Sequence, residues 1–130
     1  MFAQTLQYSD IGLFVLRFAV GIIFIVHAIP KFKHPKDMAL GIGISGMSFM
    51  IVLLGLVEMV SALYLIFGFY TQLGALLLSC VMVGAITIKI TKWGVPFSTN
   101  DKMGWEFDLV LLAANIAILL VGGGSLGIQQ

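Results

Sequence analysis

Hydrophobic residues in this chain form long, nearly unbroken stretches, unlike the one-sided or alternating patterns of a water-soluble domain. Four such stretches cover about residues 11–30, 47–69, 73–90 and 105–121. A helix needs about 20 mainly apolar residues to cross about 30 Å of hydrocarbon. The pattern therefore predicts an all-α polytopic membrane protein, a bundle of four transmembrane helices that forms one membrane domain over residues 1–130.

Polar or weakly helical residues mark the connections between these stretches. The sequence GIGISG at residues 41–46 holds three glycines and a serine, which weaken a helix, so residues 36–46 are predicted to be a loop or an interfacial segment. The sequence FYTQ at residues 69–72 predicts a tight turn. Residues 91–104 predict a polar cytoplasmic loop, and Trp93 and Trp105 are expected to lie at the level of the lipid headgroups.

Composition supports the membrane prediction. The chain is 60% hydrophobic and 10% charged, whereas soluble domains are about 45–50% apolar and about 25% charged. So few charges do not cover a water-facing surface, and the excess apolar area requires lipid as its solvent. The net charge of +1 gives no reason to expect nucleic acid as a partner. The single cysteine, Cys80, cannot form an internal disulfide or a dithiol redox pair.

The lysines predict how the bundle is oriented. They lie between the first and second stretches and around the connection between the third and fourth: Lys31, Lys33, Lys36, Lys89, Lys92 and Lys102. The two ends of the chain and the turn at residues 69–72 contain no lysine or arginine. Because positive loops stay in the cytoplasm, the lysine-rich loops are predicted to be cytoplasmic and both termini to lie outside.

Charged residues inside the apolar stretches are the main candidates for function, because an isolated charge in hydrocarbon costs several kcal/mol. At about 1.5 Å per residue, Arg17 lies about 9 Å from the outer end of its helix and Glu58 about 16 Å from either end. An extended arginine side chain spans the difference, so an Arg17–Glu58 ion pair is predicted. This pair has two interpretations: a structural lock between the first two spans, or the charged floor of a ligand site or proton relay.

A second polar group is predicted near the cytoplasmic face. His27 and Lys31 are four residues apart and share a helix face. Glu106 and Asp108 lie in the first turn of the fourth span, where negative charge is favourable and where they oppose Lys31 and Lys89. They are interpreted either as helix-end electrostatics or as part of a site.

Two other polar positions, Asn115 and His27, also have both a structural and a ligand-binding interpretation. Asn115 is predicted to point inward and either to form a hydrogen bond between helices or to contact a ligand. His27 meets lipid headgroups or binds the head group of a quinone, since an imidazole both donates and accepts and titrates near neutral pH. The ligand-site hypothesis accordingly comprises six residues: Arg17, His27, Lys31, Glu58, Glu106 and Asn115.

Known cofactor patterns are missing from the sequence. Two histidines, one of them in a loop, do not suit haem ligation between opposing helices, and no spacing matches a metal-ligand motif. No phosphate-binding or dinucleotide-binding glycine motif occurs. We therefore expect no haem, flavin, metal or iron–sulfur site in this chain, and no catalytic residue of its own.

Several segments together resemble one family. LRFAVGIIFIVHAIPKF resembles the first-helix signature of DoxX membrane proteins, an arginine followed by glycine and then H-[GA]-x-x-K-[FL]. LLGLVEMVSALYLIFGFYTQLGALLLSCVMVGAI is similar to the second and third helices, and GWEFDLVLLAANIAILLVGGGSLGI to the fourth. The match runs from about residue 11 to 128. It differs from the family pattern in Ala28, where glycine is usual, and in a C-terminal end that lacks a Pro-Gly-Arg-like finish.

The resemblance implies a four-helix bundle in a prokaryotic cell membrane and a link to redox complexes, since some relatives are similar to the DoxD-type subunit of thiosulfate:quinone oxidoreductase. The polar or boundary positions that match the family are Arg17, His27, Lys31, Glu58, Trp105 and Glu106. The leading hypothesis is a small subunit of a quinone-linked oxidoreductase or respiratory-type complex that lines or borders a quinone site. A membrane or membrane-bound redox protein, or a second copy of the chain, is the expected partner. The alternatives are an assembly subunit without a ligand site and a small-solute or proton-coupled transporter.

Overall fold

The computed structural model describes residues 8–98 and 104–126, and within these ranges the chain forms helices and no strands. The helices are α2 (Ser9–Lys33), α3 (Pro35–Gly41), α4 (Ser48–Phe67), α5 (Thr71–Thr91) and α6 (Trp105–Val121). The all-α prediction is confirmed. The expected count of four helices is not, because the segment predicted as a loop or interfacial stretch begins with the additional short helix α3.

Within the described ranges, three helices are long and apolar enough to cross a membrane: α2, α4 and α5. The fourth predicted span corresponds to α6, which has 17 residues. At about 1.5 Å per residue that is about 25 Å, somewhat less than the hydrocarbon thickness of about 30 Å. The first apolar stretch was predicted to end at about residue 30, but α2 continues through Pro30 to Lys33, and the His34 amide donates to the Pro30 carbonyl at 2.8 Å.

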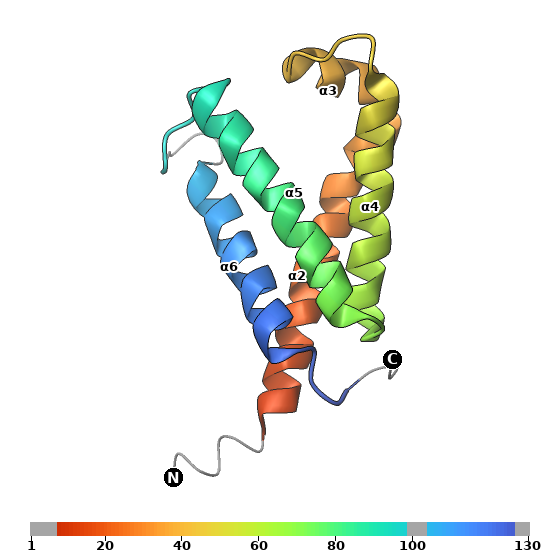
Figure 1. The fold of residues 1–130 in the computed structure, drawn as a ribbon, viewed down its shortest axis with the longest axis vertical. Coiled ribbons are helices and arrows are strands. Elements are labelled where there is room, and N and C mark those ends of the chain that lie inside the picture. The colour runs from red at the N-terminus through yellow and green to blue at the C-terminus, as the bar shows by residue number, and fades with distance from the viewer. Residues whose placement is uncertain (1–7, 99–103, 127–130) are drawn as a thin grey trace.

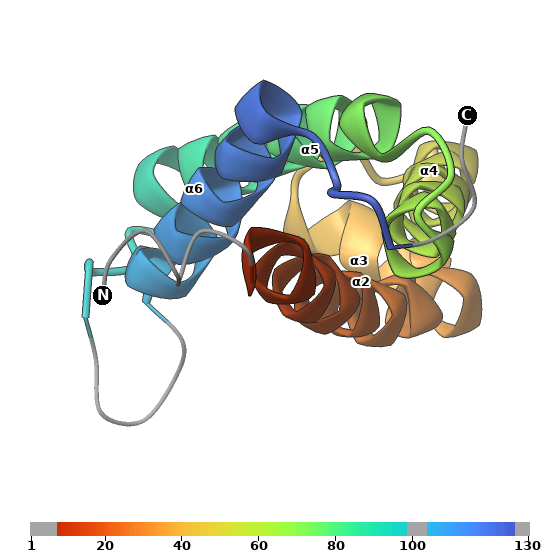
Figure 2. The same cartoon turned by 90° about the horizontal axis from the view of Figure 1, so that it is seen from below.

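The helices pack in two pairs, α2 with α4 and α5 with α6, and α4 also packs against α5 (Figure 1). Seen from below, α5 and α6 run side by side across from α2, with α4 at one side (Figure 2). The pairs lie close together at the end where α4 turns into α5, and they diverge towards the end that carries α3 (Figure 1). The bundle therefore has a narrow end and a wide end.

Close helix contact at the narrow end depends on small residues. Gly68 ends α4 in the left-handed conformation, with φ of 73°, and its amide donates to the Tyr64 carbonyl at 3.0 Å. Glycine adopts this conformation without strain, so the chain reverses within three residues and starts α5. Farther along, Gly74 lies so near α4 that a Cβ on it would be 2.9 Å from the Ser61 carbonyl oxygen. Small residues let helix backbones approach in this way when the hydrophobic effect does not drive packing between them.

Arg17 joins three segments of the chain at the narrow end by hydrogen bonds. Its side chain is fully buried. Its Nε donates to the Gly123 carbonyl at 2.9 Å and its Nη1 donates to the Leu65 carbonyl at 2.8 Å. Residues 122–126 follow α6 and cross this end of the bundle towards α2 (Figure 2), where the Ser125 hydroxyl donates to Asp10 at 2.7 Å. One guanidinium thus connects α2, the end of α4 and the glycine-rich segment after α6.

Candidate ligand cavity

The wide end of the bundle contains a partly open cavity of about 740 Å³ that α2, α3, α4, α5 and α6 all line. Its walls are mainly apolar and include Ile51, Leu54, Val81, Met82, Ala85 and Ile88. Ligand pockets for small organic molecules typically measure about 300–1,000 Å³ and combine apolar walls with a few convergent polar groups. The size and lining of this cavity fit that description.

Two ion pairs contribute the charged part of the lining. Lys31 Nζ lies 3.0 Å from Glu58 Oε2, which joins α2 to α4. Lys89 Nζ lies 2.6 Å from Asp108 Oδ2, which joins α5 to α6. All four residues line the cavity and both carboxylates are buried. Since each lysine is matched by one carboxylate, the inner part of the cavity carries polar groups without an excess charge. A fifth charged residue, Asp37 on α3, is exposed.

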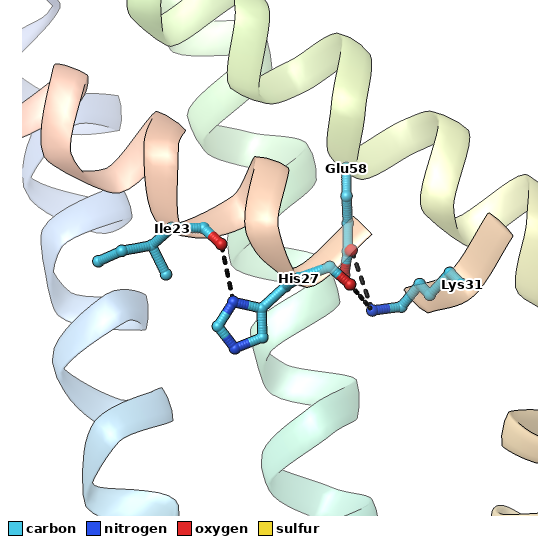
Figure 3. Close-up of polar contacts among 4 residues, drawn as sticks. All are labelled: Ile23, His27, Lys31 and Glu58. Atoms are coloured by element: carbon cyan, nitrogen blue, oxygen red, sulfur yellow. Dashed lines mark hydrogen bonds and ion pairs between the residues drawn. The ribbon is translucent and has the colours of Figure 1, made fainter. Parts of the chain in front are cut away.

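His27 lies beside the first ion pair (Figure 3). Its Nδ1 is 2.7 Å from the Ile23 carbonyl oxygen, and its backbone carbonyl accepts a hydrogen bond of 3.2 Å from Lys31 Nζ. The ring stacks on Phe107 of α6, with centroids 5.9 Å apart and planes 22° apart. In Figure 3 the Lys31 ammonium meets the Glu58 carboxylate beside the His27 backbone carbonyl, and the His27 ring points away from this ion pair.

Two hydrogen bonds join the residues directly after α5 to the end of α3 at the cavity. Lys92 Nζ donates to the Ile42 carbonyl at 2.6 Å, and Trp93 Nε1 donates to the Gly41 carbonyl at 2.8 Å. Gly41, Ile42 and Trp93 themselves line the cavity. Trp93 was predicted only as an interfacial anchor. In the structure its indole also fastens the short helix α3 against the end of α5.

The predicted Arg17–Glu58 pair is not formed. Arg17 bonds to backbone carbonyls at the narrow end, and Glu58 pairs with Lys31 at the wide end. The depth estimate took account of side-chain charges only. Carbonyls in the last turn of a helix have no partner within that helix, and Leu65 lies in that turn of α4.

Three of the six residues in the ligand-site hypothesis line the cavity: His27, Lys31 and Glu58. The other three lie elsewhere. Arg17 is at the narrow end, Glu106 is exposed, and Asn115 is buried and donates to the Leu111 carbonyl of its own helix at 2.9 Å.

The six-residue ligand-site hypothesis left out other residues that line the cavity, among them Lys89, Asp108 and Cys80. Lys89 and Asp108 were expected to be opposing boundary charges, and their ion pair agrees with that expectation. From the sequence, Cys80 was considered only for disulfide and dithiol chemistry, whereas in the structure it is exposed and lines the cavity. Lys89 could have been identified from the sequence as a candidate site residue, because it lies at the end of an apolar stretch. Nothing in the sequence distinguished Cys80.

Among the described residues no group of three or more histidine, cysteine, aspartate and glutamate side chains is arranged to hold a metal ion.

Long apolar helices that surround a cavity with internally paired charges define a small helical integral membrane protein. Residues 12–91 match the DoxX family, and the chain belongs to that family.

Two relatives illustrate the family. The chain is 32% identical to "Putative oxidoreductase CatD" of Bacillus subtilis (strain 168), over 92% of this chain and 86% of that protein. It is 35% identical to "Uncharacterized membrane protein Rv3486" of Mycobacterium tuberculosis, over 75% of this chain and 70% of that protein. No solved structure matches the chain significantly.

Proposed function

We propose that this protein is a small integral-membrane subunit of a quinone-linked oxidoreductase and that its cavity takes the ring of a quinone or quinol. The observation that carries the proposal is the combination of apolar walls with His27 and two internally neutralised ion pairs. A quinone-type ring is flat, apolar over its faces and polar only at its oxygens. A lining of this kind suits such a ring better than it suits a charged solute.

A similar protein carries a name that supports the redox part of the proposal. The relative from Bacillus subtilis is named a putative oxidoreductase. The present chain has one cysteine and two histidines, and His34 is outside the cavity. The electrons are therefore assigned to a cofactor on a membrane or membrane-bound redox partner, while this chain binds and orients the ring.

The position of the cavity fits a cytoplasmic site in a prokaryotic cell membrane. In the proposed topology α6 is the fourth span, both termini lie outside, and the wide end faces the cytoplasm. Support comes from five lysines at the wide end: Lys31 and Lys33 in the last turn of α2, Lys36 on α3, Lys89 in the last turn of α5, and Lys92 directly after α5. Positive residues favour the cytoplasmic side.

The single cysteine provides a direct test. Cys80 lines the cavity, so a ring bound there should shield it from a thiol-specific label. The probes are duroquinone and durohydroquinone, because their methyl groups fill every ring position to which a thiol could add. We expect saturating probe to slow Cys80 labelling at least tenfold in protein reconstituted in lipid nanodiscs.

A cysteine outside the cavity serves as the control. In a Cys80→Ser background, Thr87→Cys places a thiol on the same helix, at an exposed position that does not line the cavity. Its labelling rate should not change with either probe. If Cys80 labelling is also unchanged up to the solubility limit of both probes, the quinone proposal is wrong.

A further inference from the structure

The hydrogen bond of His27 determines which ring nitrogen carries the proton. Nδ1 lies 2.7 Å from the Ile23 carbonyl oxygen. A carbonyl oxygen only accepts hydrogen bonds, so at this distance the hydrogen must be on Nδ1. A neutral imidazole carries one such hydrogen. In the neutral state Nε2 therefore holds a lone pair and acts as an acceptor.

The ring is held in this orientation from more than one side. It stacks on Phe107 with a centroid distance of 5.9 Å and meets Phe24 at 6.5 Å. Nε2 points away from the Ile23 carbonyl in Figure 3. Rotation of the ring would break the Nδ1 bond and disturb the stacking, so the acceptor nitrogen stays available to a molecule in the cavity.

The two lysine ammonium groups that line the cavity already contact protein oxygens. Lys31 Nζ donates to the His27 carbonyl at 3.2 Å and lies 3.0 Å from Glu58 Oε2. Lys89 Nζ is likewise paired with Asp108 at 2.6 Å. Each ammonium carries three N–H donors, and these contacts hold both lysines against protein oxygens at the cavity wall. The Nε2 atom of neutral His27 differs from them, because it is an acceptor to which a donor on a ligand can bind.

We infer that the cavity recognises a ring hydroxyl, so that its preferred ligands are hydroquinones and related phenols rather than the quinone carbonyl form. The hydroxyl donates to His27 Nε2, and the ring lies against the apolar walls of α4 and α5. This inference rests on the proposed function, since it assumes that the cavity takes a quinone-type ring. It adds the redox form of that ring and names Nε2 as the atom that selects it.

A comparison of three matched ligands tests the inference. Durohydroquinone has hydroxyl donors, its dimethyl ether has the same ring without donors, and duroquinone has carbonyl acceptors. The concentration that halves the Cys80 labelling rate is measured for each under anaerobic conditions in nanodiscs. We expect durohydroquinone to act at a concentration at least tenfold lower than the other two.

Two variants show whether His27 causes the difference. His27→Phe retains a ring that stacks on Phe107 and removes the acceptor, so the preference for durohydroquinone should fall to about onefold. His34→Phe changes the other histidine, which caps α2 outside the cavity, and should keep the full preference. Similar affinities for all three ligands, or tighter binding of duroquinone, would overturn the hydroxyl inference and leave the quinone-site proposal standing. Failure of all three to protect Cys80 would overturn both.

The tautomer itself is measurable without relying on a substitution in the cavity. Nitrogen-15 chemical shifts of the histidines in the full chain, assigned with His34→Phe, report which ring nitrogen is protonated. We expect neutral His27 to carry its hydrogen on Nδ1. A signal with the hydrogen on Nε2 would make that nitrogen a donor and would overturn the inference even if ligands bind.

Discussion

Lys31 and Glu58 meet across the α2–α4 pair, with 3.0 Å between Nζ and Oε2. The carboxylate side chain is 3% exposed and the lysine side chain 12%. Both residues also line the cavity. The same contact therefore joins two helices and forms part of the proposed ligand site, so stability and ligand binding have to be measured separately for any change in it.

Removing one member of this pair should destabilise the protein strongly. Lys31→Met leaves the Glu58 carboxylate buried without its partner, which we expect to cost about 3 kcal/mol in the free energy of unfolding. Adding Glu58→Met should recover at least about 1 kcal/mol relative to the sum of the single changes, since an uncharged pair has nothing left to compensate. Unfolding in detergent micelles measures the cycle, and Lys33→Met at an exposed position is the control. Strict additivity would contradict a direct interaction.

Arg17 should matter for stability and not for the ligand. Arg17→Met keeps much of the length of the side chain but loses the donors to Leu65 and Gly123, and buried carbonyls are then left without partners. We expect a loss of about 3 kcal/mol, since hydrogen bonds to charged groups contribute about 1.5–3 kcal/mol each. Ligand protection of Cys80 should be unchanged at a temperature where the variant is folded. Lost protection with unchanged stability would place Arg17 in the ligand site instead.

Two glycines of α5 should respond to alanine in opposite directions. Gly74→Ala places a Cβ about 2.9 Å from the Ser61 carbonyl oxygen, so α4 and α5 must separate. We expect a loss of about 1–3 kcal/mol, as in other overpacked contacts. Gly84 has open space around its position, and alanine there should gain up to about 1 kcal/mol from helix propensity. Thermal unfolding of both variants gives the comparison, and equal effects would argue against close α4–α5 packing.

The bonds from α5 to α3 should slow access to the cavity. Lys92→Ala combined with Trp93→Phe removes the donors to Ile42 and Gly41. We expect a water-soluble thiol reagent to label Cys80 several-fold faster in this variant, because α3 is then less firmly held. Lys36→Ala, an exposed change on α3 itself, is the control and should leave the rate as it is. An unchanged rate in the double variant would show that the reagent reaches Cys80 by another route.

The charge distribution makes a prediction about orientation. Reporter fusions at either end of the chain should show both termini outside the cytoplasm. A cysteine placed at Lys36, in a Cys80→Ser background, should be labelled from the cytoplasmic side. The opposite result for both termini would invert the topology and turn the wide end outwards.

The helical class and three of the six candidate residues were predictable from the sequence, because long apolar stretches and rare charges are strong local signals. His27, Lys31 and Glu58 were chosen on that basis, and the structure brings them together in one cavity. The short helix α3 was not predicted, since GIGISG and the residues before it contain too little apolar sequence to indicate more than an interfacial segment.

The backbone carbonyls that Arg17 binds could not be predicted from the sequence. Counting residues along two helices gives their depths, but it does not show which faces meet or that the segment after α6 folds back to α2. The guanidinium found backbone carbonyls, which every residue has and which no sequence pattern marks. The same applies to Cys80, because its place in the cavity depends on the divergence of the two helix pairs.

The separation of a tied narrow end from a wide end with a cavity has an evolutionary consequence. Substitutions among the apolar residues that line the wide end can reshape what the protein accommodates, while Arg17 and the close glycine contacts continue to hold the helices together. Relatives built on the same bundle can thus differ in the shape of the wide end while they share the contacts that hold the narrow end.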